Sequence, residues 1–205
     1  MRVTAIWRYP VKSMAGERLS LAEMTATGLA GDRVVQVYDR RGRMVTARQF
    51  PRLLRPHATL GPDGERLVDG LAWHSREVAQ RVEAAVALGA RLERFDGPER
   101  FDILPLLVCT DGAVSMFGRD VRRLRPNLLT GGVERAAERE WSSGILRMPD
   151  AEVGLADLRG RCVMTTYDPD ATEQDPDVLR DIVRRFDGRL CLNGCGDSRR
   201  PCRSR

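Results

Sequence analysis

Lysine and aromatic residues are scarce in this chain of 205 residues. Lys12 is the only lysine, so one compact ammonium group stands in a chain whose other basic residues are all arginine. Aromatic residues make up 5% of the chain, and none is interleaved with the basic segments as a platform for stacked bases requires. Nucleic-acid binding is therefore not expected, although the net charge of +5 suits an anionic ligand.

Long apolar segments and common cofactor motifs are absent as well. No apolar run reaches the roughly 18 residues that a membrane helix needs. The start of the chain lacks the basic-then-apolar order of a secretion signal, so we expect a cytoplasmic protein with no membrane partner. The sequence has no iron–sulfur spacing, no glycine-rich dinucleotide fingerprint and no haem motif. Electrons for any redox reaction therefore have to come from a separate protein.

Cysteine occurs five times, an odd number at irregular spacing that favours free thiols over a disulfide framework. The three cysteines near the C-terminus fit no standard zinc pattern. Cys162 differs from the rest because Arg159 and Arg161 precede it and Thr165 and Thr166 follow. Nearby positive charge favours the thiolate, which is a soft ligand for a transition metal. The alternative is a buried strand cysteine that packs as a small apolar residue.

Hydrophobic periodicity predicts a β-rich first half. Strands are expected at residues 3–9 and 34–38, and a hairpin partner of the second at 44–46. An amphipathic helix is expected over residues 75–88, with Gly89 as its stop. The charged, turn-forming stretch that follows suggests a boundary near residue 95, between domains 1–95 and 96–205.

The second half is predicted to mix strands and helices. Strands are expected at residues 101–109, 153–158 and 161–167, and a short helix from Thr110 toward Phe117 for which Asp111 is a candidate cap. The clearest helix starts at Asp175 and stops at Gly188. Its apolar stripe is formed by Val178, Leu179, Ile182, Val183 and Phe186.

Three further segments supply hydrogen-bond donors in number but few acceptors. They are 9–13 (Tyr-Pro-Val-Lys-Ser), 28–33 with 46–49, and 122–127, which ends in Arg-Pro-Asn. This inventory suits a phosphate joined to a polar heterocycle, because phosphate oxygens take charge-assisted bonds while amides and hydroxyls bind ring edges. The alternative is that these arginines lie at the surface and pair with the abundant Asp and Glu.

Five motifs in order resemble the MOSC family, and more specifically its members with an N-terminal β-barrel domain, such as the mitochondrial amidoxime-reducing component and its bacterial relatives. They are Tyr-Pro-Val-Lys-Ser, Gly-Asp-Arg, Thr-Ala-Arg-Gln, Arg-Pro-Asn and Arg-Cys-Val-Met-Thr-Thr-Tyr-Asp-Pro-Asp. The resemblance covers about residues 3–193. It implies a β-rich α+β fold with a small N-terminal β-barrel domain and a MOSC β-barrel domain with flanking helices.

The resemblance also implies a molybdenum cofactor, a pterin dithiolene that carries a phosphate and whose metal is ligated by a cysteine. Cys162 stands at that position. The residues it implies as cofactor-binding are Lys12, Ser13 and Arg33 from the N-terminal side, Arg125 and Asn127 from the other lobe, and Thr110, Asp111 and Arg161 lining the same cleft. Arg48 either belongs to this set or holds the two lobes together.

The implied chemistry is the reduction of a small N-hydroxylated or N-oxygenated substrate, with oxygen lost as water. Asp111 and Asp168 are the candidate proton donors, and both are equally suited to be cap or turn residues. The implied partner is a separate reductase or a ferredoxin-like protein that donates electrons. The alternative function is a molybdenum cofactor carrier or a sulfur-transfer protein that uses Cys162.

The end of the sequence departs from the resemblance. After Asn193, members of this group continue through an apolar strand to a last strand that closes the barrel, whereas residues 194–205 here have almost no apolar content. We therefore expect no core strand beyond about residue 193, and a truncated or frame-shifted end. Such an end leaves an exposed sheet edge or a barrel completed by other means.

Overall fold

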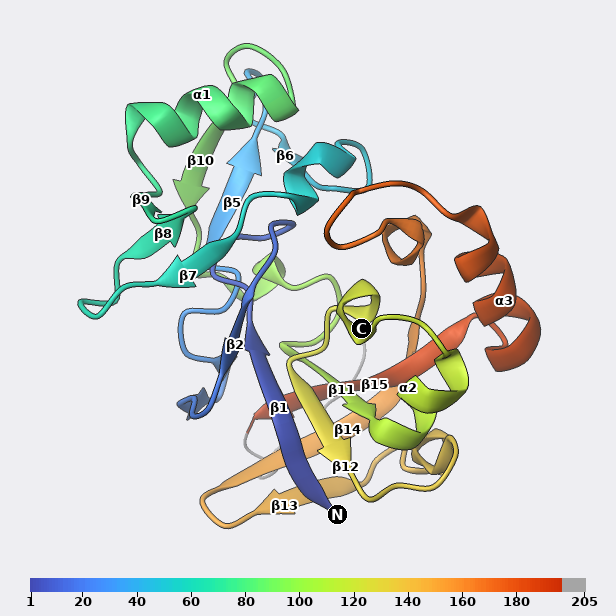
Figure 1. The fold of residues 1–205 in the computed structure, drawn as a ribbon. Helices are drawn as coiled ribbons and strands as arrows, with labels where there is room; N and C mark the ends of the chain where they lie inside the picture. Colours follow the sequence, from blue (N-terminus) through green and yellow to red (C-terminus); the bar gives the residue numbers. More distant parts are fainter. Residues whose placement is uncertain (197–205) are drawn as a thin grey trace.

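The computed structural model describes residues 1–196, and it is β-rich with few helices. Its largest element is a seven-stranded mixed sheet, seen in the lower part of Figure 1. In spatial order the strands are β13 (Ile145–Met148), β14 (Ala151–Gly160), β15 (Arg189–Gly196), β11 (Leu106–Thr110), β12 (Leu128–Gly131), β1 (Arg2–Arg8) and β2 (Glu17–Leu19). Only β11 and β12 pair in parallel.

Smaller sheets form the upper part of Figure 1. One contains β10 (Arg91–Arg94), β5 (Val35–Tyr38) and β6 (Met44–Val45), and another β7 (Ala58–Leu60), β8 (Arg66–Val68) and β9 (Leu71–Ala72). A two-stranded pair joins β3 (Met24–Thr25) and β4 (Gly28–Leu29). The expected hairpin is confirmed, because β5 and β6 pair antiparallel.

Neither expected barrel is closed within residues 1–196. The two edge strands of the large sheet, β13 and β2, do not pair with each other, and the smaller sheets stay separate. The first strand of the chain lies in the large sheet, where β1 pairs with β12 and β2. The domain boundary near residue 95 stays a prediction.

The helix α1 (Arg76–Ala85) confirms the expected amphipathic helix but is shorter than predicted. Ser75 caps it by accepting a hydrogen bond from the backbone N–H of Val78. Val78 and Val82 are fully buried in the core of this lobe. The helix ends before Gly89, which has a positive φ of 81° in the turn that leads to β10.

The helix α3 (Pro176–Phe186) begins as predicted, with Asp175 as its N-cap and a proline in the first turn. Val178, Ile182 and Phe186 pack into the core beside the large sheet. Val183 does not belong to the apolar stripe, since its side chain is 57% exposed. No helix within residues 1–196 is long and apolar enough to cross a membrane.

Two strand predictions in the second half need correction. The buried strand begins at Leu106 rather than residue 101, because Pro105 has no N–H to give to a sheet. Residues 161–167 are not a strand, since the chain leaves β14 at Gly160 and forms a 3-10 helix, Val163–Thr166. Its threonines favour this helix because their hydroxyls donate to the carbonyls of Cys162 and Val163.

The predicted absence of a core strand after residue 193 is wrong for residues 194–196. They complete β15, which lies between β14 and β11, where Gly194 pairs with both Leu106 and Leu155. The packing leaves no room for a side chain at this position, because a Cβ on Gly194 would approach Val153 Cγ1 to 2.9 Å. The remainder of the tail prediction concerns residues 197–205, which lie outside the described residues.

The expectation of free thiols is wrong for Cys109 and Cys191. A disulfide joins Cys109 on β11 to Cys191 on β15, with the Cα atoms 4.5 Å apart. The antiparallel pairing of β11 with β15 places the two residues opposite each other, although 82 positions separate them in the sequence. Cys162 is a free cysteine.

Candidate functional site

A cavity lies where the loops of the upper lobe meet the ends of β11 and β14. Eight of its lining side chains are basic and one, Asp102, is acidic. The basic residues are Lys12, Arg33, Arg48, Arg100, Arg123, Arg125, Arg159 and Arg161. Ser13, Thr46, Thr165 and Cys162 add hydroxyl groups and a thiol. Such an excess of positive charge is costly unless an anion balances it.

Three of the lining residues have a backbone conformation that favours glycine. Ser13, Arg33 and Arg125 have φ angles of 76°, 56° and 55°. Non-glycine residues in this region cost free energy and persist only where surrounding contacts hold them. These three residues are thus fixed in place by the fold.

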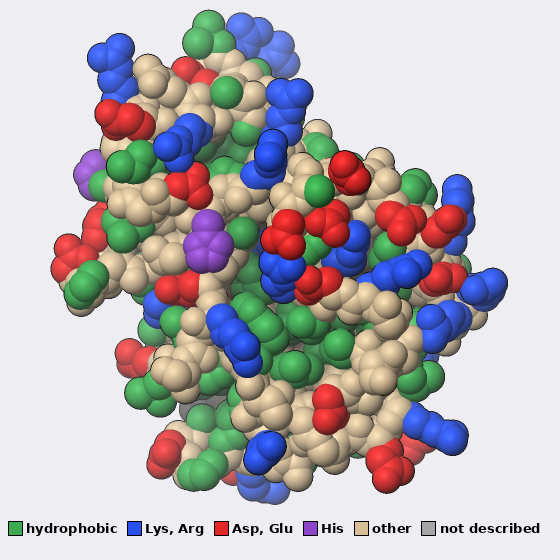
Figure 2. Space-filling model, viewed as in Figure 1, with side chains coloured by type: hydrophobic (Ala, Val, Ile, Leu, Met, Phe, Trp, Pro, Cys, Tyr) green, Lys and Arg blue, Asp and Glu red, His purple; other side chains and the backbone are tan. Residues whose placement is uncertain are grey.

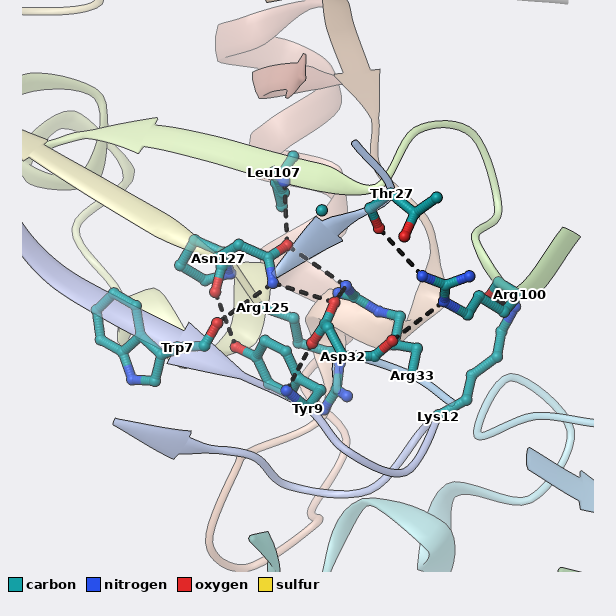
Figure 3. Close-up of polar contacts among 12 residues, drawn as sticks. Trp7, Tyr9, Lys12, Thr27, Asp32, Arg33, Arg100, Leu107, Arg125 and Asn127 are labelled. Carbon is teal, nitrogen blue, oxygen red and sulfur yellow. Dashed lines mark hydrogen bonds and ion pairs between the residues drawn. The ribbon is translucent and has the colours of Figure 1, made fainter. Parts of the chain in front are cut away.

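The buried carboxylate of Asp32 is the centre of a hydrogen-bond network that includes Arg33, a lining residue of the cavity (Figure 3). Its oxygens accept hydrogen bonds from the backbone N–H of Tyr9 at 2.7 Å and from Asn127 Nδ2 at 3.3 Å, and it also pairs with Arg33. Asn127 in turn accepts from the N–H of Leu107 at 3.1 Å. The network therefore fixes Arg33 relative to β1, β11 and β12.

Two guanidinium groups lie near the ring of Tyr9. Arg125 is 4.3 Å and Arg33 is 5.1 Å from the ring centre. Burial raises the pKa of Tyr9 to about 12, although the two arginines act in the opposite direction. The phenol is therefore neutral at physiological pH and offers its π face to both cations.

Asp102 organises two cations at the mouth of the cavity. Its carboxylate lies 3.0 Å from Lys12 Nζ and 2.6 Å from Arg48 Nη2. Lys12 Nζ also donates to the carbonyl of Arg100 at 2.8 Å. Burial acts to raise the pKa of Asp102, but Lys12 and Arg48 together bring it below its usual range. Asp102 is therefore an anion at neutral pH.

Arginines surround the thiol of Cys162. The interactions of Arg48 with Cys162 and Asp102 outweigh its burial and raise its pKa. Burial lowers the pKa of both Arg159 and Arg161 to about 10. The Nε atoms of these two arginines are buried and have no hydrogen-bond partner. Orphaned donors beside a thiol indicate a place for an anionic ligand.

Comparison with known proteins identifies several similar sequences. The model of the MOSC N-terminal beta barrel domain matches residues 1–87. Mitochondrial amidoxime reducing component 2 of Macaca fascicularis is 27% identical, over 92% of this chain and 72% of its own length. The human component 2 is 28% identical over the same shares, and the mouse component 1 is 27% identical, again over those shares. The N-terminal part of the chain therefore resembles a MOSC domain, and most of the chain is similar to amidoxime reducing components.

A solved structure also overlays on this chain. The YuaD protein from Bacillus subtilis aligns with 11% identity and a TM-score of 0.49, over 96% of this chain and 87% of that one. This likeness is too slight to bear on function. The relatives named above are mitochondrial, and the expected cytoplasmic location of this protein stays a prediction.

Most of the expected site residues meet in the cavity. The structure brings together Lys12, Ser13, Arg33, Arg48, Arg125, Arg161 and Cys162. Cys162 is half-buried at the cavity wall, so it is not the sealed strand cysteine of the alternative interpretation. Arg48 fits both of its expected roles, because it faces Cys162 and also ties the loop after β6 to Asp102, just before β11.

The structure does not bring Thr110, Asp111 and Asn127 to the lining of this cavity. Thr110 caps α2 (Asp111–Phe117) and donates to buried Glu138 at 2.9 Å. Asp111 lies at the far end of β11, where it accepts from the N–H of Gly132 at 2.7 Å. Asn127 is fully buried in the Asp32 network. Each has its hydrogen-bonding groups engaged in the fold.

Asp168 also lies outside the lining of the cavity. It pairs with Arg123 and accepts from the N–H groups of Asp170 and Ala171, so it acts as a turn residue. The lining carboxylate is Asp102, which sequence reasoning missed. Its signal was a single acidic residue inside the apolar run 101–109.

The alternative that arginines pair with acids describes the surface rather than the cavity. Figure 2 shows Lys and Arg side chains beside Asp and Glu over much of one face. Arg122, for example, binds both Asp120 and Asp170 at 2.7 Å. Surface pairs of this kind contribute little to stability. In the cavity, by contrast, cations outnumber carboxylates eight to one.

The donor set limits how a metal can be held. Within residues 1–196 no group of three or more His, Cys, Asp or Glu side chains is placed to bind a metal ion. Cys162 alone cannot hold a metal ion firmly, so a metal at this thiol needs further ligands from an organic group. A dithiolene with a phosphate fits these residues, because it brings two sulfur ligands of its own and an anion for the arginines.

Proposed function

We propose that this chain is a MOSC protein that binds a molybdenum cofactor in the Cys162 cavity and reduces N-hydroxylated small molecules. The observation that carries the proposal is a free, accessible thiol facing a cavity with eight basic side chains and one acidic one. The relatives are named for amidoxime reduction, which supports the same chemistry here. An amidoxime takes up two electrons and two protons and yields an amidine and water.

In this proposal Cys162 Sγ is the metal ligand, and it stays bound throughout the reaction. Lys12, Arg33 and Arg125 bind the phosphate and the pterin, while Ser13 donates through its hydroxyl. The Ser13 hydroxyl is oriented for this, because its oxygen accepts the N–H of Ala47 at 3.0 Å and its proton remains free to point elsewhere. When bound, the cofactor supplies oxygen-atom transfer coupled to two electrons.

Asp102 has a positioning role in this proposal. Its carboxylate, ionised at neutral pH, keeps the Lys12 ammonium and the Arg48 guanidinium in fixed positions despite their mutual repulsion. A preorganised set of charges binds an anionic ligand without reorganising. The electrons come from a separate reductase or a ferredoxin-like protein.

The experiment combines metal analysis with turnover. Freshly purified protein is analysed for molybdenum and assayed for benzamidoxime reduction with an artificial electron donor. About one molybdenum per chain with turnover supports the proposal. Loaded protein that transfers its cofactor to a cofactor-free acceptor enzyme, and shows no turnover, supports the carrier function instead. Protein expressed with cofactor supply that still holds no molybdenum refutes both.

A further inference from the structure

Arg159 differs from every other basic residue that lines the cavity. Lys12, Arg48 and Arg123 bind carboxylates, and Arg33 binds Asp32. The remaining lining arginines donate to backbone carbonyls, namely Arg100, Arg125 and Arg161. Within the described part of the chain, Arg159 makes no such hydrogen bond or ion pair, and its Nε is buried without a partner.

The backbone of Arg159 is fixed by its place near the end of a strand. It is the penultimate residue of β14, three positions before Cys162, and the strand holds its backbone in the large sheet. Burial lowers the pKa of Arg159 to about 10, and the charges of Arg33 and Arg48 add to the effect, while Asp102 and Cys162 oppose it. The guanidinium is still charged at neutral pH and lacks an acceptor.

An unpaired guanidinium in a cavity wall is unfavourable by itself and favourable once an anion binds. Asp102 pairs with Lys12 and Arg48, and within the described residues no hydrogen bond or ion pair joins it to Arg159. The planar fork of an arginine matches a carboxylate in two parallel hydrogen bonds. Arg159 and Cys162 line the same cavity, which places the guanidinium near the group that ligates the metal in the proposed function.

We infer that Arg159 anchors an anion subsite for the acidic group of the substrate, so that the preferred substrates are N-hydroxylated molecules carrying a carboxylate. This inference rests on the proposed function for its reaction, and it adds the class of substrate. Other cations of the cavity remain for the cofactor, since seven further basic side chains line it. Binding of the cofactor phosphate by Arg159 is the competing outcome.

The test uses a matched pair of substrates on the loaded protein. One is 4-carboxybenzamidoxime and the other is its carboxamide analogue, which has nearly the same shape without the charge. We expect the native protein to prefer the acid by about tenfold in kcat/KM, mostly through KM. In Arg159→Gln the ratio should fall to about one, and Arg159→Lys should keep part of the preference, because it keeps the charge.

Arg147→Gln is the matched control, because Arg147 is an exposed arginine on β13 that pairs with Glu152. It should keep the preference of the native protein. Molybdenum content is measured for every variant. Loss of molybdenum in Arg159→Gln would overturn the inference in favour of a phosphate contact, and an equal loss for both substrates would overturn it in favour of a structural role.

A binding measurement separates this inference from the reaction itself. Calorimetry of the two compounds with the loaded protein reports the preference even where neither is turned over. Absence of turnover with intact molybdenum counts against the proposed reaction alone. Equal binding of acid and amide by the native protein counts against the anion subsite, and tighter binding of the acid that disappears in Arg159→Gln supports it.

Discussion

Lys12 Nζ lies 3.0 Å from Asp102 Oδ1, so the only lysine of the chain is paired with the only carboxylate among the residues that line the cavity. The two residues come from different parts of the chain, the loop after β1 and the segment before β11. Arg48, from the loop after β6, shares the same carboxylate. One acidic side chain thus sets the positions of two cations in the proposed cofactor site.

Replacing Cys162 by serine should abolish bound molybdenum and leave the fold intact. A hydroxyl is a poor ligand for a soft metal, and the half-buried thiol accounts for little of the packing. Metal analysis and the thermal unfolding of the metal-free proteins check this. Unchanged molybdenum in Cys162→Ser would exclude this residue as the metal ligand.

Asp102→Asn should destabilise the protein and weaken cofactor retention. The change leaves Lys12 and Arg48 without their shared anion, at a cost of about 1 kcal/mol after screening of this partly exposed group by solvent. Because the pKa of Asp102 is lowered in the folded state, its contribution is present above the unfolded pKa and is lost as the pH falls through the folded pKa. The stability difference between native protein and variant should therefore be constant near neutral pH and shrink below about pH 4. A difference that does not change with pH would argue against the ion pairs.

Tyr9 should ionise at a higher pH than a free tyrosine side chain. Its pKa is raised to about 12, so the stability it contributes is present below the unfolded value near 10 and is lost as the pH rises through 12. Near-ultraviolet absorbance titration of the native protein and of Tyr9→Phe isolates this group. The last ionisation step should be missing in the variant, and a step missing at about pH 10 instead would show that Tyr9 is not buried as described.

Glu138→Gln should stabilise the protein at neutral pH. Glu138 is fully buried, one carboxyl oxygen accepts from Thr110 Oγ1 at 2.9 Å, and the other has no partner. Burial raises its pKa despite the Thr110 hydrogen bond, so stability is lost as the pH rises through the folded pKa. The amide removes the charge, and we expect a gain on the order of 1 kcal/mol at about pH 8 that fades toward pH 4. Chemical denaturation at both pH values measures it, and a gain independent of pH would contradict the titration.

Local features of the chain were predictable from sequence. The strand at the N-terminus, the β5–β6 hairpin and the Asp175 cap of α3 depend on neighbours a few residues away, whose propensities and hydrogen bonds are local. The order of five short motifs predicted five of the eight basic residues that line the cavity, together with Ser13 and Cys162. It did not predict Arg100, Arg123 or Arg159 as site residues.

The tertiary structure alone decided what depends on distant contacts. The partner of Lys12 is 90 positions away at Asp102, and the disulfide joins residues 82 positions apart, so neither spacing carries a local signal. Asn127, expected to bind the cofactor, is instead a buried residue that hydrogen-bonds to Asp32 and Leu107 beside the paired strands β1 and β12. Sequence fixes which groups are available and which short segments are ordered. Long-range strand pairing determines which of those groups become neighbours, and it left Arg159 charged and unpaired beside Cys162.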